Sequence, residues 1–243
     1  MKKKFAVFDI DGTLIRWQLY HAIVNRLAAN GDLSAEAYEK IRQARLAWKN
    51  REHDSSFRDY EIILVQQWLT ESKKLSYDQY MTIVDEVVDE YIDQAYIYTR
   101  DLIKELKKQG YFLLTISGSP KEAIARVAKR YGFDDFIGAE FLVDENNRFS
   151  GEVITPFSDK ASYLNNLVAK HGLDFAGSVG VGDTSSDIAL LELVEHPIAF
   201  NPEKKLFEVA RERGWPIVVE RKNVVYELEP HGKAYQLKKP PKG

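Results

Sequence analysis

Three short apolar runs, each followed closely by a glycine beside an aspartate or a serine, constrain the fold of this chain most strongly. The runs cover residues 5–8, 111–116 and 178–181. Short apolar runs bounded by turn residues are typical of buried strands. Segments with helical spacing of apolar residues separate them. The sequence therefore predicts an α/β fold, a Rossmann-like parallel sheet with helices on both faces.

Polar residues gather where these predicted strands end. Asp9 and Asp11 follow the first run, Ser117 follows the second, and Asp183 follows the third. The carboxyl ends of parallel strands form the edge of the sheet at which ligands bind. Two carboxylates as close as Asp9 and Asp11 repel each other, so a bound cation or a shared proton has to offset their charge. We therefore expect a functional site at this edge.

A long helical segment interrupts the strand–helix alternation after the first run. It covers residues 16–98, has apolar stripes of its own and is too large for a loop. We interpret it as an inserted helical cap domain in a core domain made of residues 1–15 and 99–225. Residues 226–243 are expected to form a C-terminal tail, disordered at its end KKPPKG.

Composition excludes several classes of function. The 243-residue chain has no cysteine, which rules out thiol nucleophiles, disulfides and cysteine-bound zinc. With 34 Lys and Arg against 37 Asp and Glu, it lacks the basic excess of a nucleic-acid binder. No apolar stretch approaches the about 18 residues of a membrane span, and the apolar run near the N-terminus is too short for a signal peptide. We expect a cytoplasmic protein with no membrane or nucleic-acid partner.

Each polar residue also has an ordinary interpretation when taken alone. Asp-Gly is common turn chemistry, acidic residues such as Asp183 and Asp187 are favoured near helix starts, and a lone Lys160 is most often a solvated surface residue. The argument for a site is that these residues occur together, in order, each at a predicted strand or helix end. No histidine spacing suggests a second metal site.

The ordered set strongly resembles the haloacid dehalogenase-like superfamily in its phosphatase branch, and is most similar to phosphoserine phosphatase-like hydrolases of subfamily IB. An insert directly after the first motif resembles that family's C1 helical cap. The matching elements are Asp9-x-Asp11-Gly12-Thr13, Ser117, Lys160 and Gly182-Asp183-x-x-x-Asp187.

The resemblance implies a role for each matching residue. Asp9 would be the nucleophile that forms an aspartyl-phosphate, a known use of carboxylates. Asp11 would protonate the leaving alcohol and then activate water, and Lys160 would offset negative charge. The phosphoryl oxygens would be held by Thr13, Ser117 and the backbone N–H of Gly118.

The resemblance also implies a Mg²⁺ ion. Asp9, the backbone carbonyl of Asp11, and Asp183 would hold it, and Asp187 would support it directly or through water. Mg²⁺ prefers such oxygen ligands.

Two departures from the phosphoserine phosphatase pattern bear on the substrate. A cap glutamate that recognises the substrate ammonium is replaced by Gln18, which offers no full charge. The cap arginine that pairs with the substrate carboxylate has no clear counterpart. We therefore expect a substrate other than phosphoserine, and Arg16, Trp17 and Gln18 are the first predicted substrate contacts leading into the cap.

The leading interpretation is a Mg²⁺-dependent phosphatase that acts on a small phosphorylated metabolite. A phosphomutase of the same superfamily and a catalytically silent binding scaffold are the alternatives. Dehalogenase chemistry is disfavoured, because it needs neither Asp11 nor the metal aspartates. The oligomeric state is not predicted.

Overall fold

A computed structural model describes residues 3–232 and 234–240 of the chain, and within them the protein forms two compact units. The first, here called the core unit, contains the described residues up to Gln18, Tyr91–Ala139 and those from Thr155 onward. The second, here called the cap unit, contains Leu19–Glu90 and Glu140–Ile154. None of the described helices is long and apolar enough to cross a membrane.

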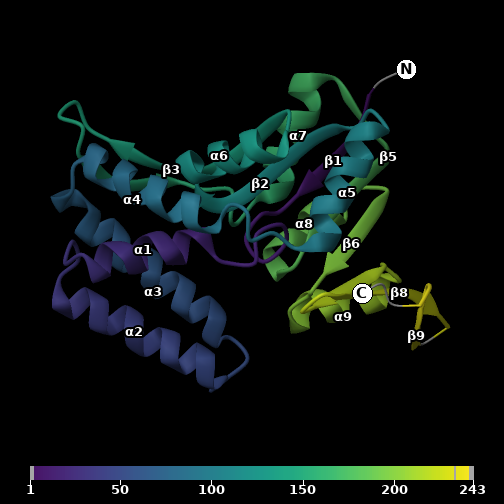
Figure 1. The fold of residues 1–243 in the computed structure, drawn as a ribbon, viewed down its shortest axis with the longest axis horizontal. Helices are drawn as coiled ribbons and strands as arrows, with labels where there is room; N and C mark the ends of the chain where they lie inside the picture. The colour runs from purple at the N-terminus through teal and green to yellow at the C-terminus, as the bar shows by residue number, and fades with distance from the viewer. Residues whose placement is uncertain (1–2, 233, 241–243) are drawn as a thin grey trace. The chain divides into compact units, whose positions relative to one another are not determined.

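A mostly parallel sheet forms the centre of the core unit (Figure 1). The full strand order is β4-β3-β2-β1-β5-β6-β7-β8-β9, with β1 between β2 and β5. The first strand, β4 (Phe149–Ile154), pairs antiparallel with the part of β3 that belongs to the cap unit. Neighbouring strands among β3, β2, β1, β5, β6 and β7 run parallel, and β8 and β9 add to β7 in antiparallel pairing. The strands are β1 (Lys3–Phe8), β2 (Phe112–Pro120), β3 (Asp135–Val143), β5 (Leu173–Gly182), β6 (His196–Phe200), β7 (Ile217–Arg221), β8 (Val224–His231) and β9 (Ala234–Leu237).

Helices cover both faces of this sheet, as the apolar runs predict. One face packs against α7, α8 and α9 in a buried cluster that includes Phe5 and Val7 of β1. On the opposite face, Tyr98 of α5 stacks on Phe200 of β6 with ring centroids 5.9 Å apart. The helices are α5 (Ile97–Lys108), α6 (Lys121–Tyr131), α7 (Lys160–His171), the 3₁₀ turn η2 (Ser185–Asp187), α8 (Ile188–Leu191) and α9 (Lys204–Arg213).

The cap unit is helical but also contains a β-hairpin. Trp68, fully buried on α3, contacts the rings of Phe141 on β3 and Phe149 on β4. Residues 140–154 belong to this unit because they complete its aromatic core. The predicted cap, a single segment of residues 16–98, did not include them. Its elements are α1 (Leu19–Ala29), α2 (Ala35–Asn50), α3 (Ser56–Glu71), the 3₁₀ turn η1 (Ser72–Lys74), α4 (Tyr77–Tyr91), the end of β3, and β4 (Phe149–Ile154).

The prediction of a separate tail from residue 226 is wrong for most of that segment. β8 and β9 form a hairpin that extends the sheet beyond β7. The hydroxyl of Tyr235 donates to the carbonyls of Ala210 and Trp215, and Leu228 packs against the core cluster. Strand pairing and these anchors order the segment despite its polar composition. Of the predicted disordered end KKPPKG, residues 241–243 lie outside the described residues.

Candidate active site

Asp9 lies directly after β1, at the carboxyl edge of the sheet. Its backbone N–H donates to Val181 O of β5 at 3.0 Å, so the parallel pairing continues one residue past the strand. On the other side of β1, the hydroxyl of Thr115 donates to Phe8 O at 2.8 Å. The Asp9 side chain is buried. Its position is therefore set by both neighbouring strands.

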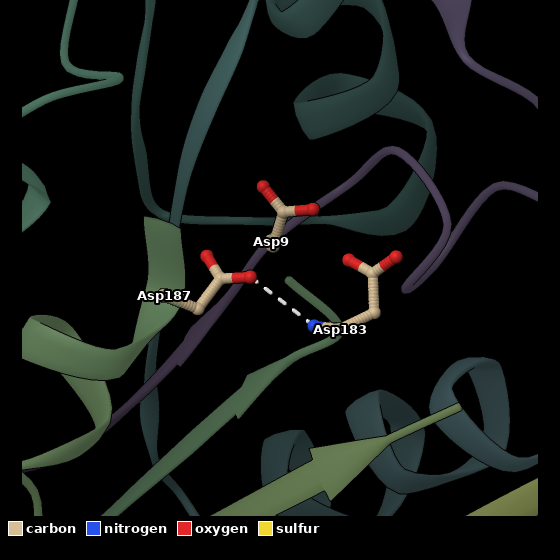
Figure 2. A group of neighbouring side chains, drawn as sticks. All are labelled: Asp9, Asp183 and Asp187. Atoms are coloured by element: carbon tan, nitrogen blue, oxygen red, sulfur yellow. Dashed lines mark hydrogen bonds between the residues drawn. The ribbon is translucent and has the colours of Figure 1, made fainter. Parts of the chain in front are cut away.

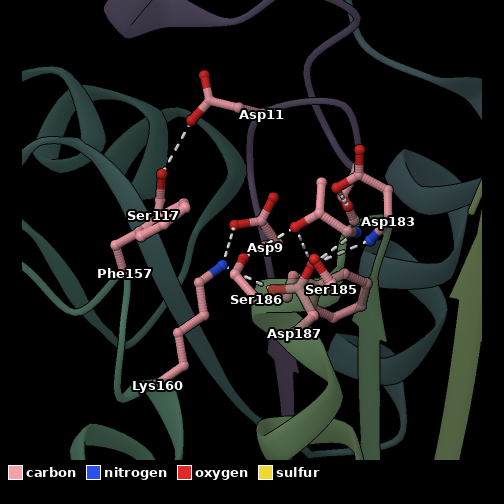
Figure 3. Close-up of polar contacts among 12 residues, drawn as sticks. Asp9, Asp11, Ser117, Phe157, Lys160, Asp183, Ser185, Ser186 and Asp187 are labelled. Carbon is pink, nitrogen blue, oxygen red and sulfur yellow. Dashed lines mark hydrogen bonds and ion pairs between the residues drawn. The ribbon is translucent and has the colours of Figure 1, made fainter. Parts of the chain in front are cut away.

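Lys160, the first residue of α7, joins two of the predicted site aspartates. Its buried ammonium donates to Asp9 Oδ1 at 2.7 Å and to Asp187 Oδ1 at 2.6 Å (Figure 3). The N-cap residue Asp159 accepts the N–H of Ser162 and so fixes the helix start. Lys160 is therefore not a solvent-exposed surface lysine, because its side chain is buried and bonds two carboxylates.

Asp187 organises the loop after β5. Its Oδ2 accepts the backbone N–H groups of Asp183 at 3.1 Å and Thr184 at 3.0 Å (Figures 2 and 3). A Cβ on Gly182 would lie 2.5 Å from the Asp187 side chain, so only glycine allows this approach. Both Asp187 oxygens are hydrogen-bonded within the protein, which suits a residue that holds the loop and Lys160 in place.

Glu203, which no sequence pattern marks as a site residue, closes the same loop from the N-cap position of α9. Its Oε1 accepts the N–H of Ser185 at 2.6 Å, and its own N–H donates to Asp183 O at 2.9 Å. The only sequence signal was an acidic residue after Asn201-Pro202 at a predicted helix start, which is ordinary capping chemistry.

Asp183 and the first motif meet at Gly12. The Thr13 hydroxyl donates to Asp183 Oδ1 at 3.0 Å. Gly12 has φ +82°, and a Cβ there would lie 2.2 Å from Asp183 Oδ2. The left-handed conformation and the close approach both require glycine. Thr13 thus orients an aspartate, which differs from its predicted contact with phosphoryl oxygens.

The carboxylates of Asp9, Asp183 and Asp187 form a group that fits a divalent cation. One oxygen from each lies within 4.8 Å of the others (Figure 2). All three donors are hard oxygens, the ligand type that Mg²⁺ prefers. The residues present therefore fit the metal that the sequence predicts.

The electrostatics of the group agree with this assignment. Burial, together with the charges of Asp187 and Asp11, raises the pKa of Asp9 to about 7, although Lys160 acts against the shift. Burial and the charges of Asp9 and Asp187 raise the pKa of Asp183 well above its ordinary value. The pKa of Lys160 is raised by Asp187 and Asp9 against the effect of burial. One ammonium does not neutralise three carboxylates, so a further positive charge would stabilise their ionised forms.

Asp11 is held by the second predicted strand end. The Ser117 hydroxyl donates to Asp11 Oδ2 at 2.9 Å and accepts the N–H of Ser119 at 3.0 Å. β2 runs on to Pro120, so Ser117 and Gly118 lie within the strand, and the predicted stop at residue 116 is too early. Its register against β3 shifts between Ile116 and Pro120, which makes this part of the strand irregular.

The three predicted substrate contacts beyond the first motif have different surroundings. Arg16 donates to Ala95 O at 3.2 Å and to Glu220 at 3.0 Å, an arrangement that ties together two parts of the core unit. Trp17 is half exposed, and its indole N–H donates to the side chain of Gln94. Only Gln18 lies beside the site, with Nε2 at 3.4 Å from the position of a Cβ on Gly12.

The comparison with protein families assigns most of the chain. Residues 6–192 match the family model described as haloacid dehalogenase-like hydrolase. The matched range contains every predicted site residue.

Named relatives and solved structures agree with this match. A histidinol-phosphatase of Neisseria meningitidis is 26% identical over 229 residues, which cover 89% of this chain and 98% of that protein. The phosphoserine phosphatase SerB1 of Mycobacterium tuberculosis is 27% identical over 222 residues, 87% of this chain and 69% of that protein. The structure of a phospho-aspartyl intermediate analogue of phosphoserine phosphatase superimposes with a TM-score of 0.64 at 20% identity, covering 92% and 96% of the two chains. The structural likeness shows the fold.

Proposed function

Since the chain belongs to the haloacid dehalogenase-like hydrolase family and resembles its phosphatases, we propose that it hydrolyses a small phosphomonoester with Asp9 as nucleophile and Mg²⁺ as cofactor. The observation that carries this proposal is the arrangement around Asp9. A buried carboxylate at a strand end is held by Lys160, and a second carboxylate, Asp11, is held two residues further on by Ser117.

Asp9 has the features of a nucleophile for phosphoryl transfer. Lys160 fixes Oδ1, which leaves Oδ2 to attack the phosphorus atom and form an aspartyl-phosphate. Positioning and charge neutralisation supply most of the catalysis in such reactions. Lys160, which bonds Asp9 directly, offsets negative charge where the phosphoryl group arrives.

Asp11 is the proposed general acid and base. In the first step it gives a proton to the oxygen of the departing alcohol, and in the second it takes a proton from the water that attacks the aspartyl-phosphate. Ser117 holds Oδ2 of Asp11 and so fixes the orientation of the carboxyl group that makes this proton transfer. The backbone N–H of Gly118, next to Ser117, is the proposed donor to a phosphoryl oxygen.

Asp9, Asp183 and the backbone carbonyl of Asp11 would hold Mg²⁺, with Asp187 in support. The ion would supply positive charge that allows an anionic nucleophile to approach an anionic phosphate. Glu203 and Asp187 keep the loop that carries Asp183 in place, as their bonds to its backbone indicate.

The relatives suggest which substrates to test. They are named for phosphoserine and for histidinol phosphate, two small phosphorylated amino compounds. Gln18 is the neutral residue beside the site, and no clear cap arginine matches a substrate carboxylate. Both features support a substrate other than phosphoserine, because its ammonium and its carboxylate would each lack a charged partner.

The test is release of inorganic phosphate from a panel that includes phosphoserine and histidinol phosphate, with Mg²⁺ and with EDTA. We expect release that needs Mg²⁺ and is lost in Asp9→Asn, which keeps the size of the side chain but removes the nucleophilic oxygen. Release from the Asp9→Asn variant at the wild-type rate would rule out the proposed nucleophile. A folded, Mg²⁺-loaded protein that acts on no compound of the panel would favour the silent scaffold.

A further inference from the structure

An exposed aromatic ring stands at the candidate active site and has no role in the proposed chemistry. Phe157 is 41% exposed and lies in the segment before α7. A Cβ on Gly118 would lie 3.5 Å from Phe157 Cδ2, so the ring edge lies beside Gly118, in the segment proposed to hold phosphoryl oxygens. Figure 3 shows Phe157 next to Ser117.

The position of the Phe157 side chain is set by the turn that leads into α7. The N–H of Phe157 donates to Thr155 Oγ1 at 3.2 Å, and the N–H of Asp159 donates to Pro156 O at 3.0 Å. The same turn ends at Lys160, whose ammonium bonds Asp9. The ring and the charge-neutralising lysine are therefore three residues apart on one well-bonded segment.

Phe157 stands on the side of the site where the alcohol departs. In Figure 3, Asp11, Ser117 and Phe157 lie on one side of Asp9, and Asp183 lies on the other. The distances agree, since Ser117 bonds Asp11 and the ring of Phe157 lies beside the adjoining Gly118. Asp11 is the group proposed to protonate the departing alcohol, so the organic part of the substrate has to pass close to it.

We propose that Phe157 contacts the organic part of the substrate and makes this site prefer phosphomonoesters that carry a flat ring near the ester oxygen. This inference rests on the proposed function and specifies its substrate class. An exposed phenyl group gains free energy when it stacks with another ring or with a delocalised cation, whereas its negative face offers nothing to a carboxylate. An imidazole or phenyl group meets this requirement, and the carboxylate end of phosphoserine does not.

The test compares the kcat/KM of ring-bearing and ring-free substrates in Phe157→Ala. Phenyl phosphate and histidinol phosphate carry a ring, and glycerol phosphate does not. We expect the variant to lose about 3- to 10-fold for the first two, the range of one aromatic contact, and to stay near wild type for glycerol phosphate. Phe157→Tyr, which keeps the ring, should retain the preference. The matched control is Phe207→Ala, which removes a ring of similar exposure (38%) on α9. This variant should leave the kcat/KM of each ring-bearing substrate unchanged relative to that of glycerol phosphate.

Two results would overturn the inference. An equal loss for all three substrates would mean that the ring only supports the turn before Lys160, and unchanged kcat/KM for all three would mean that it contacts no substrate.

Binding of phosphonates, which cannot be hydrolysed, separates this inference from the proposed function. In the presence of Mg²⁺ the wild-type protein should bind phenylphosphonate more tightly than methylphosphonate, and Phe157→Ala should remove most of that difference. Preferential binding without hydrolysis of any ester would refute the proposed function and support the ring contact. Equal binding of the two phosphonates would refute the ring contact whatever the activity.

Discussion

Replacement of Lys160 by methionine tests the electrostatic arrangement of the site most directly. The change keeps a long apolar stem and removes the ammonium that bonds Asp9 at 2.7 Å and Asp187 at 2.6 Å. Because Lys160 is only 3% exposed, water cannot replace the lost partner. Breaking a buried ion pair by removal of one partner costs about 3–5 kcal/mol, so we expect a loss of that size in the free energy of unfolding.

The measurement is urea unfolding followed by tryptophan fluorescence at neutral pH in EDTA. Lys170→Met is the matched control, because Lys170 stands on the same helix, α7, and bonds Asp135 at 2.8 Å with 63% of its side chain exposed. Exposed ion pairs contribute about 0–1 kcal/mol, so the control should unfold almost as the wild type does. Added Mg²⁺ should restore part of the lost stability of Lys160→Met, since it supplies positive charge to the same carboxylates.

Phosphatase activity should fall by at least about 100-fold in Lys160→Met, the usual effect of removing one preorganised charge-stabilising group. The reasoning would be refuted if the variant unfolded within about 1 kcal/mol of the Lys170→Met control, a surface-pair effect. That result would mean that the aspartates around Lys160 relax or take up protons at little cost.

Three further predictions concern the metal, Gly12 of the first motif, and Arg16. The pKa of Asp9 is raised from 3.8 to about 7, so the stability that its protonated form contributes is greatest below pH 4 and is lost as the pH rises through 7. Mg²⁺ should therefore raise the melting temperature more at pH 8 than at pH 5.5, where the ion competes with protons for Asp9. Equal increases at the two pH values would contradict the raised pKa. Gly12→Ala forces a Cβ against Asp183, and calorimetry should find Mg²⁺ binding about 10- to 100-fold weaker, whereas unchanged affinity would show that the loop adjusts freely. Arg16→Met should destabilise the protein by about 1.5–3 kcal/mol, because it removes a charged hydrogen bond from the buried carboxylate of Glu220, and it should leave KM unchanged. A large rise in KM at wild-type stability would restore Arg16 as a substrate contact.

The structure brings together most of the site that the sequence predicted. Asp9, Asp11 and Asp183 follow neighbouring strands of one parallel sheet, and Ser117 lies in the last part of β2; they meet because the carboxyl ends of these strands share an edge. Lys160 was expected from a resemblance and not from a pattern, since nothing in its local sequence distinguishes it from a surface lysine.

The incorrect predictions share a cause. The hairpin of residues 140–154 belongs to the cap unit because Phe141 and Phe149 pack on Trp68, from which they lie 73 and 81 residues away in the chain. β8 and β9 fall mostly within the predicted tail, and they form because β7 offers an edge for pairing and Tyr235 bonds two distant carbonyls. Local periodicity contains no information about such partners.

By itself, the sequence determined the α/β fold and which polar residues stand near its strand ends, because strand periodicity and strand-end residues are local properties. Only the tertiary structure decided which partner each polar side chain has. In it, Arg16 donates a hydrogen bond to Glu220, Thr13 donates to Asp183, and Ser117 donates to Asp11. It also placed Glu203 under the loop of Asp183 and Phe157 against Gly118. Hydrogen bonds and ring contacts depend on distances of a few ångströms between segments far apart in the chain, and those distances exist only once the sheet and its helices are packed.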